Sequence, residues 1–236
     1  MIFNLGGGAA APKLTSIAVT TNPTKTAYYK GESFNKSGMI VTAYFDDGSS
    51  SVVTGYTYSP TTMAQNTSSV TVSYTHEGIT KTTTVSVKVN LYLYNAGTTD
   101  SLVGSWGVKG NNADCTPTLE SSYIKLSGNY VYGNHYVWTT NKIDLSGYTS
   151  LKVTVTTRGD SGKVEMRIGY CSSITPDTSN FVANTHWTVA SGASTYSKTL
   201  NLSSASTSYY IMVWLGANTV DTDVNYARVT KIELLK

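Results

Sequence analysis

Short runs in which polar and apolar residues alternate, separated by tight-turn sequences, extend along almost the whole chain of 236 residues. Residues 39–45 and 70–74 alternate in this way, and the Asp47-Gly48 pair after the first of them favours a hairpin turn. Such alternation has the period of a strand with one buried face, and the sequence shows no helical periodicity. Charged residues make up only 13% of the chain, while tyrosines number 18. We therefore predict an all-β protein with almost no helix.

The N-terminal third combines apolar, tyrosine and glycine positions in a pattern that resembles the bacterial Ig-like (Big) domain family. The residues that carry this resemblance are Leu14, Ile17, Val19, Pro23, Tyr28, Gly31, Gly38, Val41, Ala43, Tyr44, Asp46, Asp47 and Gly48, followed by Val70, Val72 and Tyr74. The resemblance covers residues 13–90 and implies an Ig-like β-sandwich. It also implies a spacer or adhesive module of the kind found in bacterial surface proteins and in phage virion proteins.

Residues 91–236 carry strand signals of their own and are predicted to form a second domain. Alternation within residues 151–155 and 163–170 predicts one buried and one solvent-facing side for each strand. The predicted inward residues are Leu151, Val153, Val155, Val164, Met166, Ile168 and Tyr170, and the predicted outward residues are Lys163, Glu165 and Arg167. The segment 143–155 resembles carbohydrate-binding modules and galactose-binding-like sandwiches. The predicted fold class is therefore an Ig-like β-sandwich followed by a jelly-roll, carbohydrate-binding-module-like β-sandwich.

All four tryptophans lie in the second domain, where they are accompanied by tyrosines and histidines. Sugar rings stack their C–H faces on aromatic planes, while polar side chains bind the hydroxyl groups. This composition predicts a glycan-binding site without catalysis, which acts through stacking and neutral hydrogen bonds. The candidate residues are Tyr132, Tyr136, Trp187, Trp214 and His186. The alternative interpretation, that these rings belong to the core, stays open at this point.

Two further segments of the second domain bear on this site. The strand 209–216 is apolar on both sides: Tyr209, Ile211, Val213 and Leu215 are predicted inward, and Tyr210, Met212 and Trp214 lie opposite. A loop, a neighbouring subunit or a ligand must then cover the second side. The stretch 171–195 is too long for a simple connection and is predicted to be a functional loop.

Several other functions find little support in the sequence. The histidines His76, His135 and His186 lie in separate segments, and no known nucleophile or phosphate-loop motif occurs, so we predict no enzymatic activity. The net charge is only +3 and no run of lysine or arginine occurs, which argues against nucleic-acid binding. Because no apolar stretch reaches 18 residues, we also expect no membrane insertion.

Metal and thiol chemistry are equally limited. Asp221 and Asp223 are weak candidates for one structural calcium, with an ordinary turn as the favoured alternative, and we expect no other cofactor. Cys115 and Cys171 are interpreted as two free thiols, although one bridge between them remains open.

Residues 1–12 are rich in glycine and alanine behind the apolar residues Ile2, Phe3 and Leu5. We predict that this arm anchors the chain to other proteins of a particle. Because the start of the chain lacks a secretion signal, the sequence favours a virion protein whose second domain binds a host-surface polysaccharide. A bacterial cell-surface adhesin and an accessory module of a secreted enzyme are the alternatives. A homo-oligomer also remains open.

Overall fold

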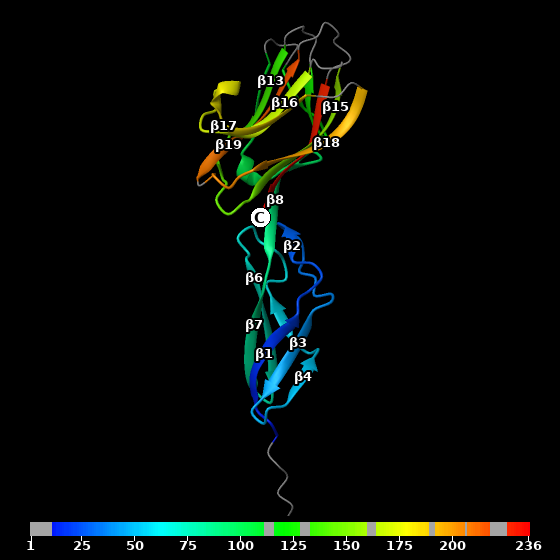
Figure 1. Cartoon of the computed structure of the whole chain (residues 1–236), viewed down its shortest axis with the longest axis vertical. Helices are drawn as coiled ribbons and strands as arrows, with labels where there is room; N and C mark the ends of the chain where they lie inside the picture. The colour runs from blue at the N-terminus through cyan, green and yellow to red at the C-terminus, as the bar shows by residue number, and fades with distance from the viewer. Residues whose placement is uncertain are drawn as a thin grey trace, which may run out of the picture. The chain divides into compact units, whose positions relative to one another are not determined.

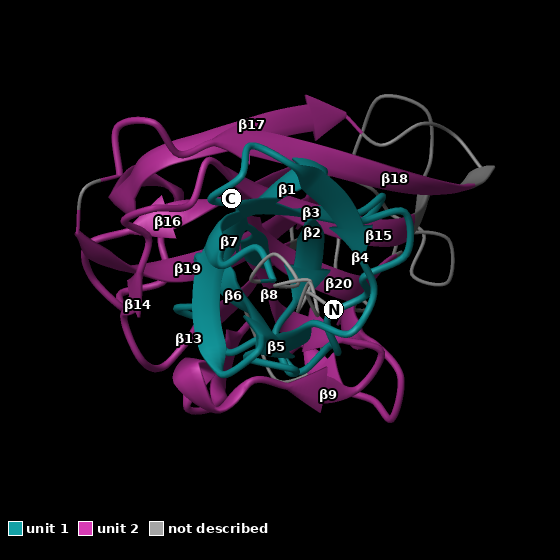
Figure 2. Ribbon diagram, turned by 90° about the horizontal axis from the view of Figure 1, so that it is seen from below, with its two compact units in different colours: residues 1–89 teal, residues 90–236 magenta. Residues whose placement is uncertain are grey.

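The computed structural model describes residues 11–110, 116–127, 133–159, 164–188, 192–205, 207–217 and 226–236. The chain divides into two compact units, of which unit 1 ends at Val89 and unit 2 begins at Asn90. Figure 1 shows that strands account for most of both units, and Figure 2 separates the units by colour. The fold class predicted from the alternating runs is confirmed: the protein is all-β.

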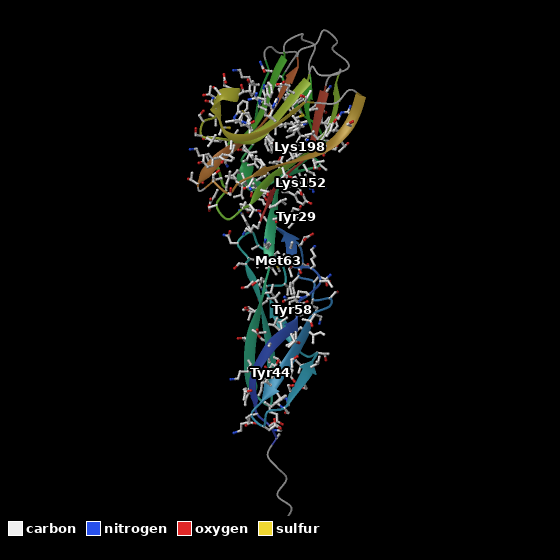
Figure 3. All side chains as sticks on the ribbon, viewed as in Figure 1. Tyr29, Tyr44, Tyr58, Met63, Lys152 and Lys198 are labelled. Carbon is white, nitrogen blue, oxygen red and sulfur yellow. The ribbon has the colours of Figure 1, made fainter. Side chains whose placement is uncertain are left out.

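Unit 1 consists of two three-stranded antiparallel sheets with the strand orders β1-β3-β4 and β5-β6-β7. The strands are β1 (Leu14–Thr21), β3 (Ile40–Phe45), β4 (Ser50–Val53), β5 (Thr57–Ser59), β6 (Ser69–His76) and β7 (Ile79–Ser86). The short strand β2 (Ala27–Tyr29) pairs with β8 (Lys88–Asn95). Inward residues of the two sheets, including Val41 and Val72, form one core together with the fully buried Met63 of the β5–β6 connection, which is labelled in Figure 3.

The turn residues of unit 1 act as the sequence predicts. Gly48 has a φ of 84°, which an L-residue rarely adopts, and the side chain of Asp47 accepts a hydrogen bond from the backbone N–H of Ser49. The hairpin between β6 and β7 places Glu77 and Gly78 at φ values of 45° and 79°. Two successive residues with positive φ are what a type I′ hairpin turn requires.

Unit 2 is a sandwich of two larger sheets, which we call the front sheet and the back sheet. The front sheet has the order β10-β13-β19-β16-β17, with β14 paired to β19. Its strands are β10 (Trp106–Lys109), β13 (Gly133–Thr139), β14 (Ile143–Asp144), β16 (Val164–Cys171), β17 (Phe181–Thr188) and β19 (Ser208–Ala217). The pairings between its described strands are all antiparallel.

The back sheet has the order β11-β12-β20-β15-β18, and β8 and β9 extend it through β20. Its remaining strands are β9 (Thr98–Thr99), β11 (Thr118–Leu119), β12 (Ile124–Ser127), β15 (Ser150–Gly159), β18 (Gly192–Asn201) and β20 (Tyr226–Leu235). The described part of unit 2 also contains two 3-10 turns, η1 (Ser101–Val103) and η3 (Thr178–Asn180). Within the described ranges, no helix has the length and apolar character needed to span a bilayer.

The core of unit 2 lies between the two sheets and contains the predicted inward residues Leu151, Val153, Val155, Met166, Ile168 and Tyr170, while the side chain of Val164 lies outside the described part of the structure. Val153 and Val155 of β15 and Ile168 of β16 are completely buried in this cluster. A fully buried aliphatic side chain of this size contributes about 1.5–3 kcal/mol to folding. The large shared core fixes which side of each strand faces inward, and therefore which side chains the front sheet presents on its outer face.

One prediction about unit 2 is wrong. Residues 171–195 are not a single long loop, because β17 occupies Phe181–Thr188 and pairs along its length with β16. On its inner side β17 places Ala183 and Trp187 near the core, with Thr185 between them. Only two of these three positions are apolar, so the strand signal is weak. The remaining connection is the short segment 172–180, which contains η3.

Candidate functional site

The outer face of the front sheet carries a row of large side chains that crosses four strands. The strand registers place Tyr136 of β13 beside Trp214 of β19, Trp214 beside Arg167 of β16, and Arg167 beside His186 of β17. Neighbouring strands are about 4.8 Å apart, so these four side chains form one continuous band. Figure 1 shows β13, β16, β17 and β19, the strands that supply it.

An apolar cluster separate from the interior core surrounds this row. Tyr136, Cys171, Met212 and Trp214 are its buried members, and Trp138, Phe181 and Tyr210 are its partly exposed members. As the sequence predicts, the residues of β19 divide between the two sides: Ile211, Val213 and Leu215 belong to the interior core, and Tyr210, Met212 and Trp214 to the outer cluster. The outer face is therefore an organised aromatic surface, which we call the outer aromatic face.

Two glycines provide room for the indoles of this face. A side chain at Gly107, which pairs with Trp138 across β10 and β13, would overlap the Trp138 indole. A side chain at Gly216 would overlap the Trp214 indole in the same way. Both rings thus lie against the backbone of the sheet. Of the two, Trp138 is the more exposed.

Hydrogen bonding and stacking fix the orientation of Trp214. Its indole Nε1–H donates to the side-chain oxygen of Asn134 at 2.8 Å. The guanidinium of Arg167 lies over the same ring at 5.2 Å from the centroid, a cation–π contact. Because the oxygen of Asn134 is engaged, its NH₂ group is the part that remains to donate to a ligand. The centre of the face thus combines an aromatic ring with two polar groups.

A polar pair lies at the β16–β17 edge of the face. His186 Nε2 is 3.1 Å from Glu165 Oε2, and the two side chains are 42% and 47% exposed. A pair with this exposure contributes little to stability, because solvent screens the charges. It does place an acceptor-rich carboxylate and an imidazole beside the guanidinium of Arg167.

The segment 172–180 folds over the other end of the row. Its turn η3 is capped by Asp177, whose carboxylate accepts from the N–H of Ser179 at 2.7 Å. These hydrogen bonds and the nearby charge of Lys109 lower the pKa of Asp177. The backbone of Thr178 hydrogen-bonds the Tyr136 hydroxyl, whose pKa is raised by burial and also by the Asp177 carboxylate. A loop therefore covers the Tyr136 end of the face.

Cys171 lies at the closed, apolar part of the cluster. It is 1% exposed, and its Sγ lies 3.6 Å from the carbonyl oxygen of Tyr210. Burial raises the pKa of this thiol to about 12. Since the thiolate is the reactive form, Cys171 is not an activated nucleophile. It is a free cysteine, and its predicted alternative partner Cys115 lies outside the described residues.

The structure corrects one of the predicted site residues. Trp187 points to the interior, where it is 8% exposed and packs in the core cluster. Lys198, labelled in Figure 3, lies over its ring at 5.8 Å from the centroid. Tyr136, Trp214 and His186 share the outer face, whereas Trp187 does not, because consecutive residues of a strand point to opposite sides.

Other predicted residues fall outside the ranges that the structure describes. These are Tyr132, the arm residues Ile2, Phe3 and Leu5, and the weak calcium candidates Asp221 and Asp223. Among the described residues, no group of three or more His, Cys, Asp or Glu side chains is arranged to hold a metal ion.

The structure adds three residues that the sequence-based site omits: Trp138, Asn134 and Arg167. Trp138 shares the alternation of Tyr136, so its side of the strand was legible from the sequence. The alternation correctly predicts that Arg167 faces outward, but an outward position alone does not distinguish a ligand-binding residue from a solvated one. The hydrogen bond from Trp214 to Asn134 joins two strands 80 residues apart in sequence and leaves no local pattern.

Comparisons with known proteins gave similar solved structures and a family match. Solved structures that resemble the chain include the K1 cleaved adhesin domain of the Lys-gingipain of Porphyromonas gingivalis W83, with 17% identity over 61% of this chain and 96% of that one, at a TM-score of 0.41. The family 11 carbohydrate-binding module of Clostridium thermocellum, solved with a mixed-linked tetrasaccharide, has 13% identity over 55% and 88%, at a TM-score of 0.36.

The enzymatically active domain of bacteriophage CBA120 tailspike protein 4 shows 14% identity over 56% of this chain and 20% of that one, with a TM-score of 0.38. A search of curated proteins gave no match. Residues 21–89 match the bacterial Ig-like domain family, group 3. This match agrees with the two packed sheets of unit 1 and with the motif residues of its sequence. The N-terminal unit of this protein is therefore a bacterial Ig-like domain.

Proposed function

We propose that this chain is a non-enzymatic phage virion protein whose second unit binds a host-surface glycan on the outer aromatic face. The observation that carries the proposal is the arrangement of Trp138 and Trp214 on the front sheet, each lying against the backbone over a glycine. An aromatic surface of this kind, ringed by polar side chains, is typical of a binding site.

The chemistry of the face suits a sugar better than an apolar ligand. Trp138 presents a partly exposed ring for the C–H side of a pyranose. Elsewhere on the same face, Asn134 supplies an amide, Glu165 a carboxylate and His186 an imidazole. These groups donate to and accept from hydroxyl groups. A purely apolar ligand would leave them desolvated without partners, which costs free energy.

A shallow face of this type gives weak affinity for one copy. Single-site dissociation constants between millimolar and micromolar correspond to about −4 to −8 kcal/mol. Many copies on one particle raise the overall avidity by orders of magnitude without any new contact. In this proposal the Ig-like unit is the spacer, and the arm with Ile2, Phe3 and Leu5 attaches the chain to other virion proteins.

Glycan binding is tested on an array of microbial surface polysaccharides with the full chain, tetramerised through a biotin tag. We expect specific capture that Trp138→Ala reduces at least tenfold. The control is Tyr44→Ala, which removes a 37% exposed tyrosine from unit 1, labelled in Figure 3. Absence of any capture, or equal loss in the two variants, would contradict the proposed site.

The virion assignment needs a separate measurement. The assignment is supported by the resemblance of unit 1 to Ig-like modules found in virion proteins. Bacterial surface proteins contain modules of the same kind. Mass spectrometry of purified phage particles from the producing strain is expected to find the chain in stoichiometric amounts. Detection on the bacterial cell wall alone would favour the alternative of a cell-surface adhesin.

A further inference from the structure

The charged groups of the outer aromatic face are unequally compensated. Glu165 contacts His186 at 3.1 Å, and the carboxylate of Asp177 lies close enough to Lys109 for that charge to lower its pKa. Arg167, in contrast, forms no ion pair with any residue that the structure describes. The centre of the face therefore holds a cation that forms no ion pair, while the nearby Glu165 carboxylate is paired with His186 instead.

The environment of Arg167 makes this cation suited to binding. Its guanidinium is held over the Trp214 ring, so the planar group has a defined orientation. Its Nε is buried and has no hydrogen-bond partner among the described residues. Because a ligand cannot reach the buried Nε, the terminal NH₂ groups of the guanidinium are the donors available for a charge-assisted contact.

Other charges around the cluster do not cancel this one. Lys142 Nζ lies 5.6 Å from the centroid of the Tyr210 ring, at the opposite end of the face from Glu165. With Lys109 and Arg167, three bases thus stand against the two acids Glu165 and Asp177 among the residues that the structure describes. This excess of basic side chains favours a ligand with negative charge. It changes the prediction made from the sequence, in which the glycan is bound only by stacking and neutral hydrogen bonds.

We propose that the glycan bound by this face is acidic, and that Arg167 binds the carboxylate of a uronic-acid residue. This inference rests on the proposed glycan-binding function. The guanidinium fork matches the two oxygens of a carboxylate, and such charge-assisted pairs are stronger than neutral ones. β13 and β16 flank β19, and Trp138 lies two residues along β13 from Tyr136, which is level with Trp214 and Arg167. Trp138 and Arg167 are therefore separated by two strand spacings and two residues along the strand, about 12 Å in total. Trp138 then stacks on one sugar residue while Arg167 binds its neighbour.

The test uses pairs of polysaccharides that differ only at the carboxylate. Each uronate-containing glycan is immobilised beside its carboxyl-reduced, neutral counterpart, and capture of the tetramerised full chain is measured. We expect carboxyl reduction to weaken capture about tenfold or more, because a charge-assisted hydrogen bond contributes more than a neutral one. Raising the salt concentration from 50 to roughly 500 mM should weaken capture of the acidic form selectively.

Protein variants then assign the effect to Arg167. Arg167→Gln should remove the preference for the acidic form, and Arg167→Lys, which keeps the charge but loses the fork, should retain only part of it. Lys88→Gln, at an exposed position of unit 1, is the matched charge control. Carboxyl reduction alters the ligand alone, so that arm stays decisive if Arg167→Gln unfolds.

Each outcome has a distinct meaning. Capture of neutral glycans only, capture of phosphorylated or sulfated glycans only, or an unchanged preference in a folded Arg167→Gln variant would overturn the inference and leave the glycan-binding function intact. Failure to capture any glycan would overturn both.

Discussion

The two sides of the front sheet are both rich in apolar residues, yet they differ in kind. The interior side is mainly aliphatic at its centre, where Val137, Ile168 and Val213 are completely buried against the back sheet. The outer side carries aromatic rings with polar handles together with Arg167 and Glu165. An aliphatic layer suits close packing, whereas rings combined with hydrogen-bonding groups suit a ligand that is itself both apolar and polar.

Two consecutive residues of β17 show the same contrast. Trp187 packs in the interior core and His186 contacts Glu165 on the solvent side. Because neighbours in a strand point to opposite sides, a single position in sequence separates a stability role from a surface role. Substitutions on the two sides should therefore change different measured quantities.

The largest expected effect is on stability, from Trp187→Ala. Removing a core tryptophan should lower the free energy of unfolding by about 3–5 kcal/mol, because the cavity is only partly refilled. Chemical denaturation followed by tyrosine fluorescence measures the change. A loss below about 1 kcal/mol would show that Trp187 does not support the core, and it would contradict the different roles assigned to the two sides of the sheet.

A second effect concerns pH and the closed part of the outer cluster. Burial raises the pKa of the Cys171 thiol from 9.0 to about 12, so the folded state favours the neutral thiol. The resulting stabilisation is fully present below pH 9 and is lost as the pH rises toward 12. At pH 11 the loss should be about 2.7 kcal/mol, since one pKa unit corresponds to about 1.4 kcal/mol.

Denaturation of the wild type and of Cys171→Ala at pH 8 and pH 11 tests this prediction. The variant starts from a lower stability but should show a smaller decrease between the two pH values. Parallel decreases in the two proteins would mean that Cys171 is accessible to water.

A third effect should appear in binding rather than in stability. Gly107→Ala introduces a methyl group that overlaps the Trp138 indole and forces the ring to move. We expect severalfold weaker glycan capture, with a smaller change in unfolding free energy than Trp187→Ala produces. The Gly55→Ala variant, whose added methyl group meets no other atom within 4 Å, is the matched control. Unchanged glycan capture by Gly107→Ala would show that Trp138 is not part of the binding site.

The smallest effect is expected for His186→Ala. An ion pair between half-exposed side chains contributes about 0–1 kcal/mol, so the melting temperature should hardly change. Compared with Trp187→Ala, this variant tests whether adjacent residues on opposite sides of β17 differ in their effect on stability. A loss comparable to that of Trp187→Ala would contradict the assignment of the two residues to opposite sides.

Much of this architecture could be predicted from the sequence. The alternation in 209–215 gave the correct division of side chains between core and outer cluster, because β19 is covered by apolar groups on both sides. The Asp47-Gly48 turn was legible from its residue types. β17 was missed because its inner side includes Thr185 and therefore lacks a continuous apolar stripe.

The candidate site was harder to predict, because its membership depends on contacts between distant segments. The register that sets Arg167 beside Trp214 joins β16 to β19 and has no counterpart in local sequence. The segment 172–180 covers Tyr136 and leaves Trp138 more exposed, a difference that two positions on the same side of one strand do not reveal. Trp187 was misplaced for a related reason: a tryptophan in a polar stretch fits a surface as well as a core.

The central claim is that the outer aromatic face, and no other part of unit 2, binds the glycan. Titration of ¹⁵N-labelled protein with a captured oligosaccharide tests it most directly, with the four indole N–H signals assigned by Trp→Phe variants. We expect the signals of Trp138 and Trp214 to shift in proportion to occupancy, while those of Trp106 and Trp187, both in the interior cluster, stay in place. Shifts confined to Trp106 and Trp187 would contradict it.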